Sequence, residues 1–126
     1  MGRRKKSTVI RRSGFEDRVE KFLKSKKVKY KYEPFAIKYT VPERIARYTP
    51  DFVLDNGVIV ECKGLWDAAS RKRMALVVAQ NPSKDIRMLF MRDNFIRKGS
   101  ETTYSMWATK NNIPFAIGTI PKNWYE

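Results

Sequence analysis

Apolar side chains recur every three or four positions between residues 15 and 23, which is the spacing of one face of an α-helix. Ser13 precedes this run, and Glu16 follows Ser13 by three residues, as in the Ser-x-x-Glu pattern of a helix-capping box. We therefore predict a helix that begins after Ser13 and ends near Lys27.

The period changes to two after this helix, because apolar residues alternate with lysine and glutamate over residues 28–33. Pro34 interrupts the alternation, and a second extended run covers residues 35–41. Residues 42–47 are mostly polar and show no clear period. We therefore predict two extended segments followed by a connector over residues 42–47.

A β-hairpin is predicted in the middle of the chain. Two apolar triplets, residues 52–54 and 58–60, flank Asp55-Asn56-Gly57, and Asn-Gly between such runs is a strong hairpin signal. Helices and strands alternate afterwards: a helix over residues 67–80, a strand over 86–91, a helix capped at Thr102 or Thr103 that ends near 111, and a strand over 115–117. This order predicts an α/β fold with a mixed β-sheet flanked by helices.

Positive charge is concentrated near the N-terminus. The chain holds 27 Lys and Arg against 13 Asp and Glu, and residues 1–31 contain 13 of the basic and 3 of the acidic residues. We expect a flexible basic arm over residues 1–12 that binds nucleic acid, because the charge continues beyond the arm. A membrane surface or a nuclear import receptor is the alternative partner. The basic side chains of the arm are Arg3, Arg4, Lys5, Lys6, Arg11 and Arg12.

Arg71, Lys72 and Arg73 stand early in the helix predicted over residues 67–80. Basic residues there oppose the helix dipole, and a phosphate partner would offset that cost. We therefore predict DNA contact from all three residues.

Other features narrow the class of protein. One cysteine excludes an internal disulfide and indicates a reducing cytoplasm, and the absence of histidine excludes Ser-His triads and His-ligated zinc. No apolar run approaches the roughly 18 residues of a membrane span. We expect neither a membrane partner nor a small-molecule cofactor.

The predicted hairpin brings three chemically apt side chains together. Glu61 and Lys63 share one face of a strand while Cys62 points to the other, and the hairpin returns Asp51 beside them. Carboxylates, with the Cys62 backbone carbonyl as a further ligand, suit Mg²⁺ or Mn²⁺ in phosphodiester hydrolysis. The structural alternative is an exposed hairpin with an ordinary Glu–Lys ion pair.

Three segments resemble the phage endonuclease I family of Holliday-junction resolvases: residues 13–17 (SGFED), 48–52 (YTPDF) and 61–66 (ECKGLW). Lys98-Gly99-Ser100 and Ile120-Pro121-x-x-Trp124 also match, so the resemblance runs from about residue 11 to the end of the chain. It implies a restriction-endonuclease-like fold and an intertwined homodimer.

Carried over by position, the resemblance implies that Glu16, Asp51, Glu61 and Lys63 are the catalytic residues. The three carboxylates and the Cys62 carbonyl would bind two divalent cations in each site. From the residues alone, Glu16 is instead a helix-capping residue. Cys62 replaces an expected threonine, and we predict that this is tolerated because the side chain faces away from the metal site.

We therefore expect a homodimeric endonuclease that resolves four-way DNA junctions. Residues 13–126 would form one nuclease domain, with residues 13–41 exchanged between chains through the connector at 42–47. The alternatives are a restriction or repair nuclease of the same fold, or a basic nucleic-acid-binding protein without catalytic activity.

Deleting residues 1–12 should flatten the salt dependence of DNA binding. The slope of log K against log salt falls by about 0.9 for every phosphate that the protein no longer neutralises. Titrations of both proteins from low to high salt measure the two slopes, and equal slopes would exclude the arm as a DNA-binding element.

Overall fold

A computed structural model describes residues 13–41 and 44–126, so the basic arm lies outside the described residues. Its elements, in chain order, are α2 (Gly14–Ser25), β1 (Tyr30–Tyr32), β2 (Ile37–Val41), β3 (Arg44–Tyr48), β4 (Phe52–Leu54), β5 (Ile59–Lys63), α3 (Ala68–Gln80), β6 (Ile86–Phe90), α4 (Tyr104–Lys110), β7 (Phe115–Ile117) and the 3-10 turn η1 (Lys122–Trp124). None of the described helices is both long and apolar enough to span a membrane.

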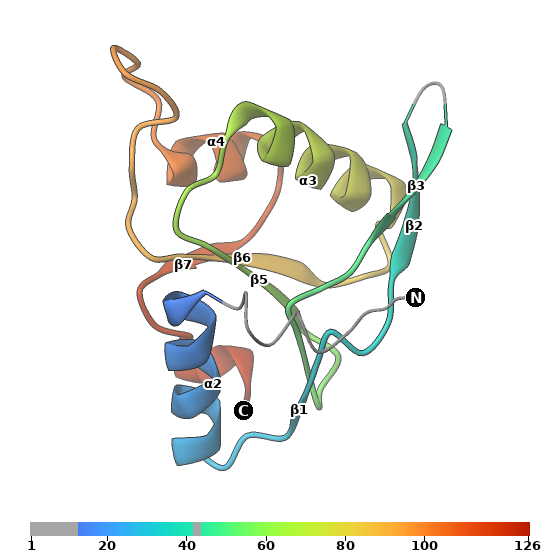
Figure 1. The fold of residues 1–126 in the computed structure, drawn as a ribbon, viewed down its shortest axis with the longest axis vertical. Coiled ribbons are helices and arrows are strands. Elements are labelled where there is room, and N and C mark those ends of the chain that lie inside the picture. Colours follow the sequence, from blue (N-terminus) through green and yellow to red (C-terminus); the bar gives the residue numbers. More distant parts are fainter. Residues whose placement is uncertain (1–12, 42–43) are drawn as a thin grey trace.

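Five strands form the central sheet in the order β1-β4-β5-β6-β7. The pairs β1–β4 and β4–β5 are antiparallel, whereas β5–β6 and β6–β7 are parallel. α3 crosses between the parallel strands β5 and β6, and α4 between β6 and β7 (Figure 1). The predicted mixed α/β sheet is thus confirmed.

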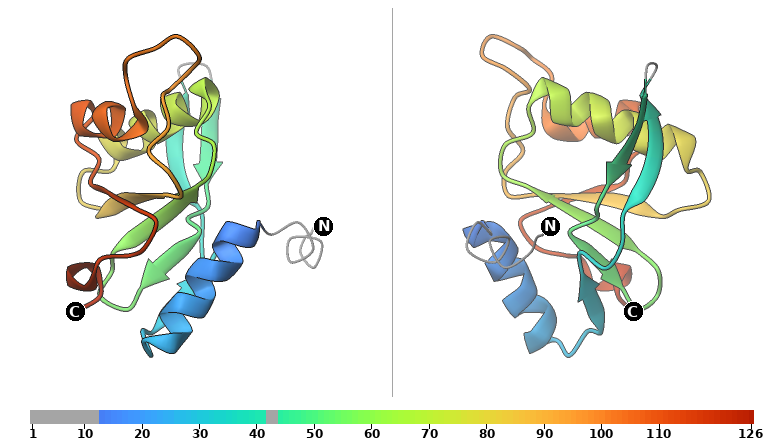
Figure 2. Two further views of the ribbon diagram at one scale, coloured as in Figure 1. Left: turned by 90° about the vertical axis from the view of Figure 1, so that its left-hand side faces the viewer. Right: turned by 45° about the vertical axis from the view of Figure 1, so that its right-hand side comes forward.

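Helices cover both faces of this sheet (Figure 2). On the side of α3 and α4, Ile59 of β5 packs in a cluster with Met74 and Ala108. On the side of α2, Val60 and Cys62 of the same strand pack with the apolar residues of α2 and with Trp124 of η1. The alternation along β5 therefore divides one strand between two cores.

The predicted capping and turn residues are confirmed. The side chains of Ser13, Asp67 and Thr103 cap α2, α3 and α4. The β4–β5 hairpin closes with a hydrogen bond from Gly57 N to Leu54 O of 2.9 Å, and Gly57 has φ of 93°. This left-handed conformation favours glycine at the end of a three-residue loop.

The prediction of a connector over residues 42–47 is wrong for residues 44–47, which belong to β3. This strand pairs with β2 in a separate antiparallel hairpin. Its inward side chains are Ala46 and Tyr48, while Ile45 is 71% exposed. Only an alanine and a tyrosine mark the inward face of β3, and the largest aliphatic residue points outward. This gives a weak period-two pattern in the sequence.

The β2–β3 hairpin is attached to α3. The Gln80 side-chain amide donates to the carbonyl of Thr40 at 2.7 Å, and the backbone N–H of Thr40 donates to the Gln80 amide oxygen. Ile37, Tyr39 and Tyr48 of the hairpin are buried in the same core as Met74 of α3. The hairpin is therefore held over the sheet, where Tyr48 reaches the site described next.

Candidate active site

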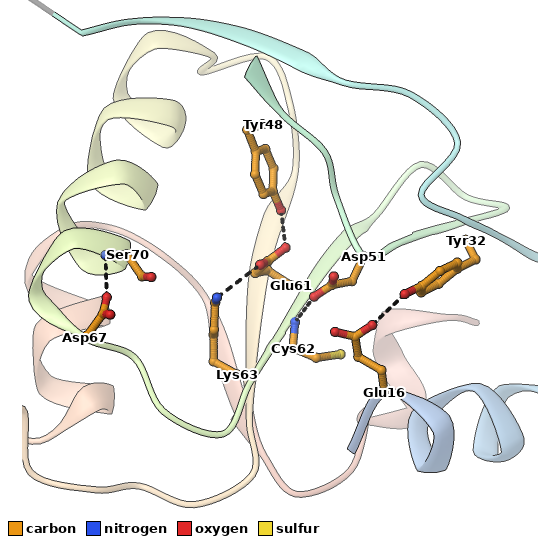
Figure 3. A network of polar contacts seen from close by, with 9 residues as sticks. All are labelled: Glu16, Tyr32, Tyr48, Asp51, Glu61, Cys62, Lys63, Asp67 and Ser70. Carbon is orange, nitrogen blue, oxygen red and sulfur yellow. Dashed lines mark hydrogen bonds and ion pairs between the residues drawn. The ribbon is translucent and has the colours of Figure 1, made fainter. Parts of the chain in front are cut away.

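Asp51 and Glu61 lie side by side at the end of the β4–β5 hairpin. The register pairs Phe52 with Val60, so one step further along the antiparallel strands Asp51 faces Glu61. Asp51 is 9% and Glu61 5% exposed. Lys63, two residues along β5, places its Nζ 3.9 Å from Glu61 Oε2 (Figure 3). The three side chains predicted to converge are thus brought together.

Cys62 contributes its backbone to this site. Its N–H donates to Asp51 Oδ2 at 2.9 Å, while its side chain packs in the core beneath α2. The N–H and the carbonyl of a strand residue point to the same side. The Cys62 carbonyl is therefore directed to the side of the strand on which Asp51 lies, and the thiol is turned away as predicted.

Glu16 reaches the site from the first turn of α2. Its backbone N–H donates to Ser13 Oγ at 3.0 Å, and its carboxylate accepts a hydrogen bond from the Tyr32 hydroxyl at 2.6 Å. Carboxylate oxygens of Glu16, Asp51 and Glu33 lie within 4.8 Å of one another. Only the Ser13 half of the predicted capping box is therefore formed among the described residues, because the Glu16 carboxylate is directed to Tyr32 and the acidic cluster.

Two further residues reach the site without having been predicted from the sequence. Glu33 joins the cluster from the end of β1, where its backbone N–H donates to Asp51 O at 3.0 Å. Tyr48 of β3 is 4% exposed, and its hydroxyl donates to Glu61 Oε1 at 2.7 Å. Recognising the inward alternation of β3 would have indicated Tyr48, whereas Glu33 carries no sequence signal because pairing of β1 with β4 places it there.

Burial dominates the electrostatics of the site. It raises the pKa of Asp51 to about 9, and repulsion from Glu61 and Glu16 adds to the increase. Burial also raises the pKa of Glu61, opposed by the hydrogen bond from Tyr48 and the charges of Lys63 and Arg73. Lys63 and Arg73 bring positive charge to a site with four carboxylates, those of Glu16, Glu33, Asp51 and Glu61. This set of oxygen donors fits a divalent cation, which would stabilise the ionised carboxylates.

The three basic residues of α3 differ in their surroundings. Arg71 is 7% exposed, and its guanidinium donates to the carbonyls of Trp66 at 2.7 Å and Ile96 at 3.2 Å. The structure gives Arg71 this role in place of the predicted DNA contact, because these carbonyls lie within the fold. Lys72 is exposed. Arg73 lowers the pKa of Glu61, and its buried Nε has no hydrogen-bond partner among the described residues.

Buried carboxylates beside a lysine, carried on the strands of a small α/β sheet, are typical of nucleases. The sequence agrees: residues 1–126 match the family described as phage endonuclease I, and the chain belongs to that family. It is 47% identical to endodeoxyribonuclease 1 of Enterobacteria phage T3 over 111 residues, which are 87% of this chain and 73% of that protein. Identity to endonuclease I of Escherichia phage T7 is 44% over 116 residues, 91% of this chain and 78% of that one.

The thermal stability of the metal-free protein should fall as pH rises from about 4 to about 9. The folded state holds a proton on Asp51 in this window that the unfolded state releases, because the folded pKa is about 9 against an ordinary value of 3.8. The melting temperature in EDTA should drop by roughly 3–5 °C per pH unit at most, and Asp51→Asn should reduce the slope. Identical slopes for the two proteins would mean that Asp51 ionises normally.

Proposed function

We propose that this protein is a metal-dependent DNA endonuclease that resolves four-way junctions. The observation that carries the proposal is the buried pair Asp51 and Glu61, which Glu16 and Lys63 flank on either side (Figure 3). DNA as substrate is supported by the name endodeoxyribonuclease of the T3 relative and by the net charge of +14. Junction selectivity is supported by the family resemblance.

The Asp51 carboxylate lies between those of Glu16 and Glu61, so one cation could bind on each side of it. Asp51 and Glu61, with the Cys62 carbonyl, would hold one Mg²⁺ or Mn²⁺, and Asp51 and Glu16 would hold a second. When bound, such cations polarise the phosphate and lower the pKa of an attacking water. Burial keeps bulk water away from the carboxylates and strengthens their attraction for the cations.

Lys63 and Arg73 are the cationic side chains of the mechanism. The Lys63 side chain is 22% exposed, so its ammonium group can meet a phosphate entering from solvent while staying near Glu61. There it would stabilise the negative charge that grows on the phosphate oxygens during attack. Arg73 would add positive charge near Glu61, where it would favour an incoming phosphate of the DNA.

A homodimer suits a junction because a four-way junction offers two symmetry-related phosphodiesters. Recognition would rest on shape and phosphate contacts, supplied by Lys72, Arg73 and the basic arm. We also propose that residues 13–41 exchange between the two chains, so that Glu16 of one chain completes the site of the other. β2 and β3 pair along Ile37–Val41 and Arg44–Tyr48, and in an exchanged dimer the same pairs would form between chains.

Asp51→Asn, Glu61→Gln and Lys63→Ala should each abolish cleavage while leaving junction binding nearly intact. Removal of a metal ligand should cost on the order of 10³-fold or more in rate. The measurement is cleavage of a labelled four-way junction and of a linear duplex with Mg²⁺ or with EDTA.

Cys62→Thr is the matched control for these variants. It alters the same strand but changes a side chain in the core beneath α2, so activity should be retained. Glu61→Gln protein that cuts at nearly the wild-type rate would contradict the assigned site. Equal cleavage of junction and duplex would favour a restriction or repair nuclease, and binding without metal-dependent cleavage would favour a non-catalytic binding protein.

Co-refolding of Glu16→Gln with Asp51→Asn should restore nicking that neither homodimer shows. With exchange, one site of each heterodimer carries both defects and the other carries none. Without exchange, every site keeps one defect. The measurement is single-strand nicking of a junction by tagged heterodimers purified after mixing, and pure heterodimers without nicking would exclude the composite site.

A further inference from the structure

Two loops leave the sheet at the edge where Lys63 lies. One follows β5 and contains Gly64 to Asp67, and the other follows β6 and spans residues 91–103, which we call the distal loop. The backbone N–H of Met91 donates to the carbonyl of Lys63 at 2.9 Å, so the distal loop begins beside the active-site lysine. It projects beyond α3 and α4 and is drawn in orange in Figure 1.

The distal loop is held in one conformation by its own hydrogen bonds. Ile96 N donates to Thr102 O at 2.8 Å, and Ser100 N donates to Arg97 O at 3.1 Å across the tip, where Gly99 has φ of 83°. Its base is fastened as well, because the buried guanidinium of Arg71 bridges the carbonyls of Ile96 and Trp66. A loop fixed in this way presents its side chains at a small entropic cost on binding.

The side chains that it presents combine an aromatic ring with positive charge. Phe95 is 60% exposed, and Arg97 and Lys98 are exposed at the tip. Of its two acidic residues, Asp93 is engaged with the backbone N–H and the hydroxyl of Ser105. Exposed aromatic and basic groups on one element are the combination that binds unstacked bases and their phosphates.

Several large apolar side chains of these two loops are exposed. The seven large hydrophobic residues that are exposed in the described chain include Leu65, Met91 and Phe95, all from the two loops. Phe95 is four residues from Met91, so its Cα lies at most about 14 Å from the Cα of Met91. With a rise of 3.4 Å per nucleotide of one strand, this upper limit corresponds to about four nucleotides from Met91, which lies beside Lys63.

We propose that the distal loop binds DNA beside the cleaved phosphate, with Phe95 stacked on a base exposed at the branch point. Arg97 and Lys98 would bind the flanking phosphates. This inference rests on the proposed junction-cleaving function and assigns to the Lys98-Gly99-Ser100 segment a role in substrate binding. A second copy of the chain is a poorer partner for this element, because two such loops would bring Arg97 and Lys98 against like charges.

Binding of a four-way junction carrying 2-aminopurine at the branch point tests the proposal. All proteins carry Glu61→Gln, so that the substrate stays intact, and a linear duplex is titrated in parallel. Phe95→Ala should weaken junction binding by about tenfold and remove the fluorescence change of the branch-point base, with duplex binding nearly unchanged. Phe95→Tyr should retain both signals, because it keeps the ring.

Lys84, an exposed basic residue at the opposite edge of the sheet, is the control for Arg97 and Lys98. Arg97→Ala with Lys98→Ala should weaken junction and duplex binding alike and reduce the salt slope by about 1.8. Lys84→Ala should change nothing, because residue 84 precedes β6 and lies at the opposite edge.

The outcomes separate this inference from the proposed function. Phe95→Ala protein that binds the junction as tightly as its parent and gives the same fluorescence change would overturn the inference alone. A second pair of results would also overturn it: Phe95→Leu binds the junction as tightly as the parent, and Phe95→Ala dissociates the dimer in sedimentation. The loop would then dock on a second copy of the chain and not on a base. A parent protein that binds junction and duplex equally would overturn the proposed function on which the inference rests.

Discussion

The burial of two facing carboxylates is the constraint around which the site is arranged. Asp51 and Glu61 face each other across the end of one hairpin, each less than a tenth exposed. In the described structure, Lys63 is 3.9 Å from Glu61 and provides one positive charge against this pair and Glu16. Burial raises the pKa of both hairpin carboxylates despite this charge, and divalent cations are the ligands that would stabilise their ionised forms.

The fold holds three of the four carboxylates, those of Glu16, Asp51 and Glu61, by one oxygen each. Tyr48 donates to Glu61 Oε1, Tyr32 donates to Glu16 Oε1, and the backbone N–H of Cys62 donates to Asp51 Oδ2 (Figure 3). Each donor comes from a segment remote in sequence from its acceptor or from a neighbouring strand. Such contacts fix the carboxylates before any cation binds, which lowers the reorganisation needed at the moment of reaction.

The parallel strands β5 and β6 bring Lys63 and the distal loop to one edge of the sheet. The carboxyl ends of parallel strands are a common place for ligands in α/β sheets, because loops and helix starts meet there. Lys63 ends β5 at this edge, and the distal loop leaves β6 beside it. Arg71 connects the loop after β5 to the distal loop, so a buried arginine of α3 joins the two parts of the edge into one surface.

The sequence by itself determined the hairpin, the helix caps and the convergence of Asp51, Glu61 and Lys63, because turn chemistry, capping and period-two alternation act over a few residues. The family resemblance added Glu16. Only the tertiary structure decided that Arg44–Tyr48 is a strand, that Tyr48 and Glu33 reach the site, and that Arg71 faces inward. These placements depend on pairing and packing between segments far apart in the chain, such as β2–β3 against α3, and local patterns carry little information about such contacts.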